Sequence, residues 1–210
     1  MVGVLRNFEL NDPDVGHLRC LLHGPVGAGK SSFINSVNNV FQGRITSGAL
    51  VAAASGTSFT KTYKTHYIKN GNARLPFAFN DVMGLEAQEN GMQPKDLINA
   101  LKGHLPEGYK LFHSIISSTG IPQVVVMTMP DKACVLVDSD VKRIYTSKAI
   151  KEKMQTCSNE LGVPMNCMLP VKNYHEEEML DDDMDIRILN AMTQIMNFAN
   201  DYIWDLQQHA

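Results

Sequence analysis

The sequence predicts an α/β domain whose sheet is doubly wound and mainly parallel, with one antiparallel hairpin at its edge. Three observations support this fold. Strand-like apolar runs alternate with stretches of helical periodicity. A glycine-rich turn joins the first strand to the first helix, and Asn70-Gly71 is typical of a hairpin turn. A length of 210 residues fits one domain, expected over 17–210 after a lead-in at 1–16.

Composition excludes several classes of protein. The net charge of −3 lacks the basic excess that nucleic-acid binding needs, so we expect no nucleic-acid partner. No apolar run approaches the roughly 20 residues of a membrane span, and the first residues do not resemble a signal peptide. The four cysteines form no CxxC pair and read as free thiols, which indicates a reducing compartment.

Each element of the first half has a local signal. The apolar run at 18–22 suits a buried strand, and apolar residues from 31 to 41 recur at helical spacing. Residues 43–59 are rich in small residues and predict a mobile loop. The hairpin strands are expected at 60–68 and 75–80.

The second half continues the alternation of helices and strands. Its periodicity predicts strands at 123–128 and 165–171 and helices at 94–101, 139–161 and 186–206. The last helix carries apolar residues at three- and four-residue steps, which predicts a face docked on the core.

Residues 24–31 carry the strongest motif of the chain. They read Gly-Pro-Val-Gly-Ala-Gly-Lys-Ser and match GxxxxGK[ST], the P-loop that cradles phosphates between a strand and a helix. Glycines let backbone N–H groups face the phosphate oxygens, Lys30 reaches the outer phosphates, and Ser31 ligates Mg²⁺. The predicted nucleotide-binding residues here are Gly24, Gly27, Ala28, Gly29, Lys30, Ser31 and Ser32.

A second motif follows the strand at 75–80. Asp81-Val82-Met83-Gly84 reads DxxG, in which Asp81 holds Mg²⁺ through water and the Gly84 N–H meets the γ-phosphate. Val82 follows Asp81 where ATPases that activate water usually carry a second acid, so an ATP-using enzyme is disfavoured. Thr57 or Thr60 completes the Mg²⁺ shell, and the sequence does not choose between them.

The strand at 123–128 ends in a candidate base-recognition motif. Guanine-nucleotide-binding proteins place NKxD or TKxD there, and the Asp carboxylate accepts hydrogen bonds from guanine N1 and N2. Thr128 and Asp131 fit this motif, whereas Met129 replaces its lysine. Lys172, after the strand at 165–171, is a further candidate contact to the base. We therefore expect GTP or GDP with Mg²⁺ as the ligand.

Leu85 bears on hydrolysis. Ras-like GTPases carry at this position a Gln that orients the attacking water, which a leucine cannot do. We expect a weak GTPase at most, unless a protein partner or a second copy supplies the missing group. Ordering of the loops at 43–60 and 82–93 by the γ-phosphate would then gate binding of such a partner.

Several segments together resemble a known family. The segments 21–36, 58–60, 81–85, 101–104, 150–154 and 169–174 are similar to the GTPase-like domain of interferon-induced protein 44 and its 44-like relatives. The resemblance implies a cytoplasmic, interferon-responsive protein of antiviral or antiproliferative defence with a guanine-nucleotide-binding domain.

One departure concerns the centre of the sheet. The family has an apolar strand ending in Asp before the strand at 123–128, and no such run is found near 114–115. Either this segment is deleted, or residues are left out of the numbering there. A true deletion predicts that the strands at 18–22 and 123–128 pair directly, with Asp131 about 4.8 Å nearer the P-loop. A degenerate domain that serves as an antiviral interaction scaffold is the alternative function.

Overall fold

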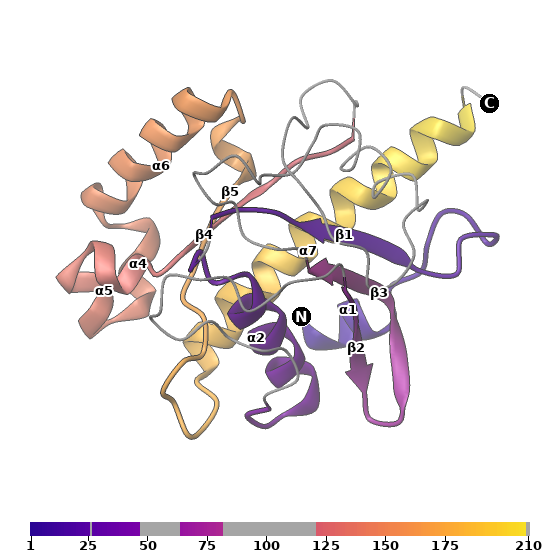
Figure 1. Ribbon diagram of the computed structural model, residues 1–210, viewed down its shortest axis with the longest axis horizontal. Helices are drawn as coiled ribbons and strands as arrows, with labels where there is room; N and C mark the ends of the chain where they lie inside the picture. Colours follow the sequence, from indigo (N-terminus) through magenta and orange to yellow (C-terminus); the bar gives the residue numbers. More distant parts are fainter. Residues whose placement is uncertain (26, 47–63, 82–120, 209–210) are drawn as a thin grey trace.

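The computed structural model describes residues 1–25, 27–46, 64–81 and 121–208, and these form a mixed α/β fold (Figure 1). The predicted loop at 43–59, except for its first residues, and the predicted helix at 94–101 lie outside the described residues. The elements are α1 Val2–Arg6, β1 Leu18–Leu22, α2 Lys30–Gln42, β2 Lys64–Asn70, β3 Ala73–Asp81, β4 Val125–Thr128, α4 Pro130–Ala133, α5 Val135–Ser139, η1 Val141–Tyr145, α6 Lys148–Leu161, η2 Met165–Cys167, β5 Met168–Val171 and α7 Asp182–Gln208.

The described strands form two sheets. In the first, β3 lies between β1, to which it is parallel, and β2, to which it is antiparallel. The antiparallel pair is the predicted hairpin, and Gly71 in its turn has the positive φ of 61° that favours glycine. In the second sheet β4 and β5 pair in parallel.

The prediction that β1 and β4 pair directly is wrong for the described residues. There β1 pairs with β3, and β4 pairs with β5. The physical reason is that the β4–β5 sheet is positioned by helices on both of its faces rather than by a hydrogen-bonded ladder to β1. Leu169 and Val171 of β5 belong to the core beneath α7, whereas Met168 belongs to a second core with α6.

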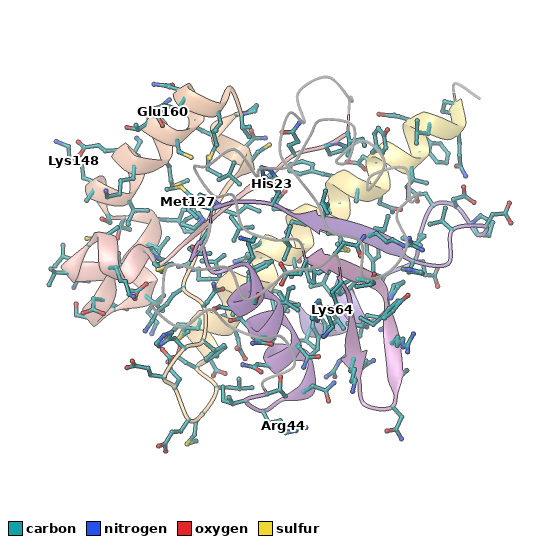
Figure 2. All side chains as sticks on the ribbon, in the orientation of Figure 1. His23, Arg44, Lys64, Met127, Lys148 and Glu160 are labelled. Carbon is teal, nitrogen blue, oxygen red and sulfur yellow. The ribbon has the colours of Figure 1, made fainter. Side chains whose placement is uncertain are left out.

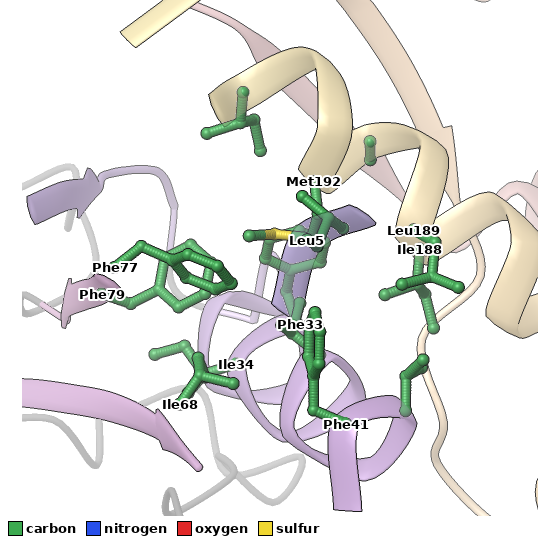
Figure 3. Packing of buried hydrophobic residues seen from close by; sticks show 14 of the residues in the cluster. Leu5, Phe33, Ile34, Phe41, Ile68, Phe77, Phe79, Ile188, Leu189 and Met192 are labelled. Carbon is green, nitrogen blue, oxygen red and sulfur yellow. The ribbon is translucent and has the colours of Figure 1, made fainter. Parts of the chain in front are cut away.

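The larger core fills the space between the first sheet, α2 and α7. Leu75, Phe77 and Phe79 occupy every second position of β3 and therefore lie on the same face of the strand. All three are buried. Phe79 packs edge to face on Phe33 of α2, with 5.8 Å between ring centroids (Figure 3). This packing fixes α2, and with it the P-loop at its N-terminus, against the sheet.

The predicted lead-in at 1–16 packs against the larger core. Residues 2–6 form a short helix that no pattern in the sequence predicts, and its Leu5 is only 1% exposed in the larger core. Arg6 donates to the Phe41 carbonyl oxygen at 3.0 Å. Further along, the side chain of Asn11 donates to the carbonyl oxygen of Asn200 at 3.1 Å, so the lead-in contacts both α2 and α7.

Most predicted elements differ from the observed ones in their bounds, and three of them show a local cause. The helix expected over 139–161 is interrupted, because Ser147 adopts an extended conformation and caps α6 by accepting a hydrogen bond from the Ile150 N–H. The strand expected over 165–171 begins only at Met168, after a 3-10 turn. The last helix begins earlier than expected, because the Asp181 carboxylate accepts from the N–H groups of its first turn.

Among the described helices none combines the length and the apolar character needed to cross a membrane.

Candidate nucleotide-binding site

The magnesium-binding residues predicted from two separate motifs meet at one edge of the first sheet. Because β1 and β3 are parallel and Leu22 is in register with Asp81, the segments after both strands emerge at the same edge. The Ser31 hydroxyl, in the first turn of α2, donates to Asp81 Oδ2 at 2.8 Å. Asp81 itself is buried, at 2% exposure. A hydroxyl and a carboxylate in contact are oxygen donors of the kind that Mg²⁺ prefers.

The P-loop backbone takes conformations that favour glycine. Gly27 and Gly29 have φ values of 76° and 79°, and Gly24 has a φ of 155°. Gly29 is also the N-cap of α2, and neither a side-chain cap nor an acidic residue occupies the first turn. The N–H groups at this helix start can therefore face an anion without competition from carboxylates of that turn.

Lys30 is folded over the loop. Its ammonium donates to the carbonyl oxygens of Gly24 and Pro25, both at 2.9 Å. Burial lowers the pKa of Lys30, and the nearby Asp81 carboxylate opposes that shift. Within the described residues two of the three ammonium donors are thus held by the loop, and an ammonium group has a third donor that it can offer to an anion.

The second sheet supplies two side chains that hold the P-loop. Thr128, the last residue of β4, donates from Oγ1 to the Ala28 carbonyl oxygen at 2.8 Å. Asn173, two residues after β5, donates from Nδ2 to the Gly29 carbonyl oxygen at 3.2 Å. These bonds link residues that are 100 and 144 positions apart in the sequence. They bring the predicted phosphate and base residues to one place even though β1 and β4 do not pair.

Gly29 is enclosed by these two side chains. A Cβ atom at this position would lie 3.0 Å from Asn173 Nδ2 and 3.3 Å from the Thr128 side chain. Only a residue without a side chain fits this contact at the observed backbone conformation.

Two buried acceptor atoms of this region have no hydrogen-bond partner among the described residues: Asp131 Oδ1, on the short helix α4, and Asn173 Oδ1. Met129, which precedes α4, has a φ of 55°, and it is the one non-glycine residue with positive φ in the described ranges. An unpaired buried acceptor costs free energy, and a ligand that donates to it removes that cost.

Lys172 lies beside this pair and is itself paired. Its ammonium is 3.0 Å from Glu177 Oε1. Burial alone would lower the pKa of Lys172, but the carboxylates of Glu177, Asp131 and Asp138 outweigh burial and raise it. Asn173, rather than its neighbour Lys172, is therefore the residue of this segment that touches the P-loop. The signal that points to it is its place in the short segment that follows the end of β5.

Several predicted site residues belong to segments that the structure does not describe. Thr57, Thr60 and Gly84, together with Leu85, lie outside the described residues. In the part of the chain that the structure describes, no group of three His, Cys, Asp or Glu side chains is arranged to hold a metal ion by itself.

Sequence comparison identifies relatives of this chain. Human interferon-induced protein 44 is 27% identical over 256 residues, which cover 98% of this chain and 57% of that protein. Human interferon-induced protein 44-like is 28% identical with the same coverage. Mouse interferon-induced protein 44 is also 28% identical, over 60% of its length. No family model matches the chain, and no solved structure matches it.

The extent of these matches bears on the missing strand. The chain spans 57–60% of the length of these relatives. Because 98% of 210 residues is about 206, a match over 256 residues leaves about 50 positions without a residue of this chain. That difference agrees with the expectation that the chain is shorter than the family within the shared region. Over nearly its whole length the chain is therefore similar to interferon-induced protein 44 and its 44-like relatives.

Proposed function

From this similarity and the geometry of the site, we propose that the chain binds a guanine nucleoside triphosphate together with Mg²⁺ on a G-domain-like fold. We place this activity in the cytoplasm, in an interferon-induced innate immune response. The cysteines there remain free thiols, as they are in the structure.

The observation that carries the proposal is the hydrogen bond from Thr128 to Ala28. It joins the P-loop, which suits a phosphate chain, to the segment that presents Asp131. A nucleotide whose phosphates lie on the α2 N-terminus would then have its base near the unpaired Asp131 Oδ1. Guanine offers two donors, N1–H and the N2 amino group, to a carboxylate. Adenine offers no such pair, so a carboxylate with a buried, unpaired oxygen favours guanine.

Within the bound complex this chain's residues have distinct tasks. Lys30 neutralises part of the phosphate charge, and the first-turn N–H groups of α2 bind phosphate oxygens. Ser31 and Asp81 would hold the magnesium ion, directly and through water, and the ion supplies charge stabilisation for the phosphates. Hydrolysis is expected to be slow, because Leu85 has no group that orients water.

A non-hydrolysing interaction scaffold is the second candidate. It is favoured by the division of the described strands into two sheets and by Met129 at the lysine position of the base motif. In this case the site would retain its packing while its affinity for nucleotides is lost.

Calorimetric titration with GTP, GDP and ATP in the presence of Mg²⁺ separates these functions. We expect binding of GTP and GDP, much weaker binding of ATP, and loss of GTP binding in Lys30→Ala. Lys151→Ala, which removes an exposed lysine of α6, is the matched control and should bind as the unmodified chain does. Preference for ATP would overturn the guanine assignment, and absence of binding to all three would leave the scaffold.

A further inference from the structure

The two halves of the described chain differ in charge. Its residues up to 81 include seven Lys and Arg against four Asp and Glu, whereas residues 121–208 include eight against fourteen. All five ion pairs found among the described residues lie in the second half. The basic residues of the first half are therefore not neutralised by ion pairs within these ranges.

Four of these basic residues line a hollow of about 700 Å³ between α2 and β2. They are Arg44, Lys64, Lys69 and Arg74. All four are exposed, and no acidic side chain of the described chain lines the hollow. Figure 2 labels Arg44, which follows α2, and Lys64, at the start of β2. We call this feature the basic groove.

The basic groove is bridged by a hydrogen bond and has one apolar side chain in its wall. Gln42 of α2 donates from its side chain to the Lys69 carbonyl oxygen at 2.7 Å, which holds the two walls together. The Arg74 guanidinium lies 4.3 Å from the centroid of the Tyr67 ring and is oriented by it. Ile45, which is only partly buried, lines the same hollow and offers it an apolar side chain. A partner that fits would combine negative charge with an apolar side chain.

Such a combination occurs in this chain, in the segment 175–181 between β5 and α7, which we call the acidic loop. It projects from the body of the molecule beside the start of α7 (Figure 1). Glu176 and Glu178 are exposed, with 88% of the Glu176 side chain accessible, and Met179 between the acidic clusters is 79% exposed. The acidic loop therefore presents an exposed apolar side chain between its carboxylates.

The acidic loop is held at both of its ends. Glu177 pairs with Lys172 at one end. At the other end the Tyr174 hydroxyl accepts from the Asp181 N–H at 2.7 Å and donates to Asp185 Oδ1 at 2.6 Å. Because its ends are fixed, the loop loses less conformational freedom on binding than a free tail would.

We propose that the acidic loop of one copy of this chain inserts into the basic groove of a second copy, with Met179 against Ile45 and with Glu176 and Glu178 against the basic walls. Charge complementarity selects this occupant, because the groove and the loop carry opposite charges and each carries an apolar side chain. If two copies exchange loops reciprocally, the contact closes into a two-fold dimer. The association is expected to be strengthened at low ionic strength.

The test measures the mass of the full chain by sedimentation velocity without nucleotide, at ionic strengths of about 0.02 M and 0.5 M. We expect dimers at low salt that dissociate at high salt. The groove variant Lys69→Glu/Arg74→Glu and the loop variant Glu176→Lys/Glu178→Lys should each dissociate, with affinity lowered by more than about tenfold. Mixed in equal amounts they should associate again, because the unmodified groove of one then meets the unmodified loop of the other, and the two altered surfaces are also opposite in charge.

A matched control is Lys148→Glu/Lys151→Glu on the exposed side of α6, which changes the charge equally and should leave the dimer intact. The proposal is overturned if the unmodified chain stays monomeric at low salt, or if the mixed variants do not associate. A monomer whose groove instead binds a polyanion such as heparin would also overturn it. Since no nucleotide is present, these results are independent of GTP binding.

Discussion

Gly29 is one of the residues through which the P-loop contacts the side chains that follow the second sheet. It combines a φ of 79° with two side chains that a Cβ atom at this position would meet. Gly27, in the same loop, has a φ of 76°, but a Cβ atom there would meet no described atom within 4 Å. Substituting each glycine by alanine therefore distinguishes two effects: backbone strain is expected at both positions, and a steric clash only at Gly29.

We predict that Gly29→Ala destabilises the protein more than Gly27→Ala. Both variants place alanine in the left-handed region, at a cost of about 1–2 kcal/mol each. Only Gly29→Ala also displaces Asn173 and Thr128, so it should lose nucleotide binding as well. Urea unfolding of both variants measures the difference. Equal free energies of unfolding would show that the contact between Gly29 and the second sheet contributes nothing.

Glu177 makes the stability of the fold depend on pH. Partial burial would raise the pKa of Glu177, but the His175 N–H, at 2.8 Å, and the Lys172 ammonium outweigh burial and lower it. A depressed pKa means that Glu177 stabilises the fold fully above its unfolded value near 4.5 and ceases to do so as pH falls through the lower folded value.

We therefore expect Glu177→Gln to be less stable than the unmodified chain at neutral pH, with a difference that shrinks at acidic pH. Free energies of unfolding measured at several pH values test this. The neighbouring Glu176→Gln is the control, since that side chain is 88% exposed and should change stability little. If the difference in free energy of unfolding between Glu177→Gln and the unmodified chain grew as pH falls, the lowered pKa of Glu177 would be contradicted.

At the scale of elements, α6 depends on the residue that caps it. Ser147 is 7% exposed, caps the helix through the Ile150 N–H at 3.3 Å and also donates to Cys134 Sγ at 3.2 Å. Ser147→Ala should cost about 1 kcal/mol, whereas Ser147→Thr keeps the oxygen and should cost less. Thr156→Ala, in the exposed interior of the same helix, is the control. If chemical denaturation found the same free energy of unfolding for Ser147→Ala as for the unmodified chain, the capping role of Ser147 would be refuted.

Elements with a strong local signal could be predicted from the sequence. The bounds of β1 are those predicted, and α2 differs by one residue at each end, because an apolar run and a helical period flank the P-loop motif. The residues that the two motifs single out, Ser31 and Asp81, also meet, since parallel strands end at one edge. The interruption at Ser147 escapes such a prediction because apolar periodicity continues across it, and α1 escapes it because five residues are too few to show a period.

The long-range features could not be predicted in this way. The hydrogen bond of Asn173 to Gly29 joins residues 144 positions apart, and no local pattern encodes it. The division into two sheets likewise depends on the packing of β5 between two cores, which follows from the tertiary arrangement of α6 and α7.

For the whole molecule, the central claim is that one nucleotide joins two separately built halves. The P-loop follows β1 of the first sheet, and Asp131 lies after β4 of the second sheet. The hydrogen bond from Thr128 to Ala28 links the two. The relatives contain about 50 more positions in the shared region, yet the two halves still meet at the P-loop in this chain. Recognition of the base at Asp131 is the part of this claim that most needs a direct test.

The most direct measurement is the affinity of Asp131→Asn for GTP and for xanthosine triphosphate. Xanthine carries an oxygen where guanine carries its amino group, so an asparagine amide can donate where the aspartate accepted. We predict that GTP binding weakens by at least about a hundredfold and that xanthosine triphosphate binds instead. Asp138→Asn, on exposed α5, should leave GTP binding unchanged. Undiminished GTP binding by Asp131→Asn would contradict guanine recognition at this site.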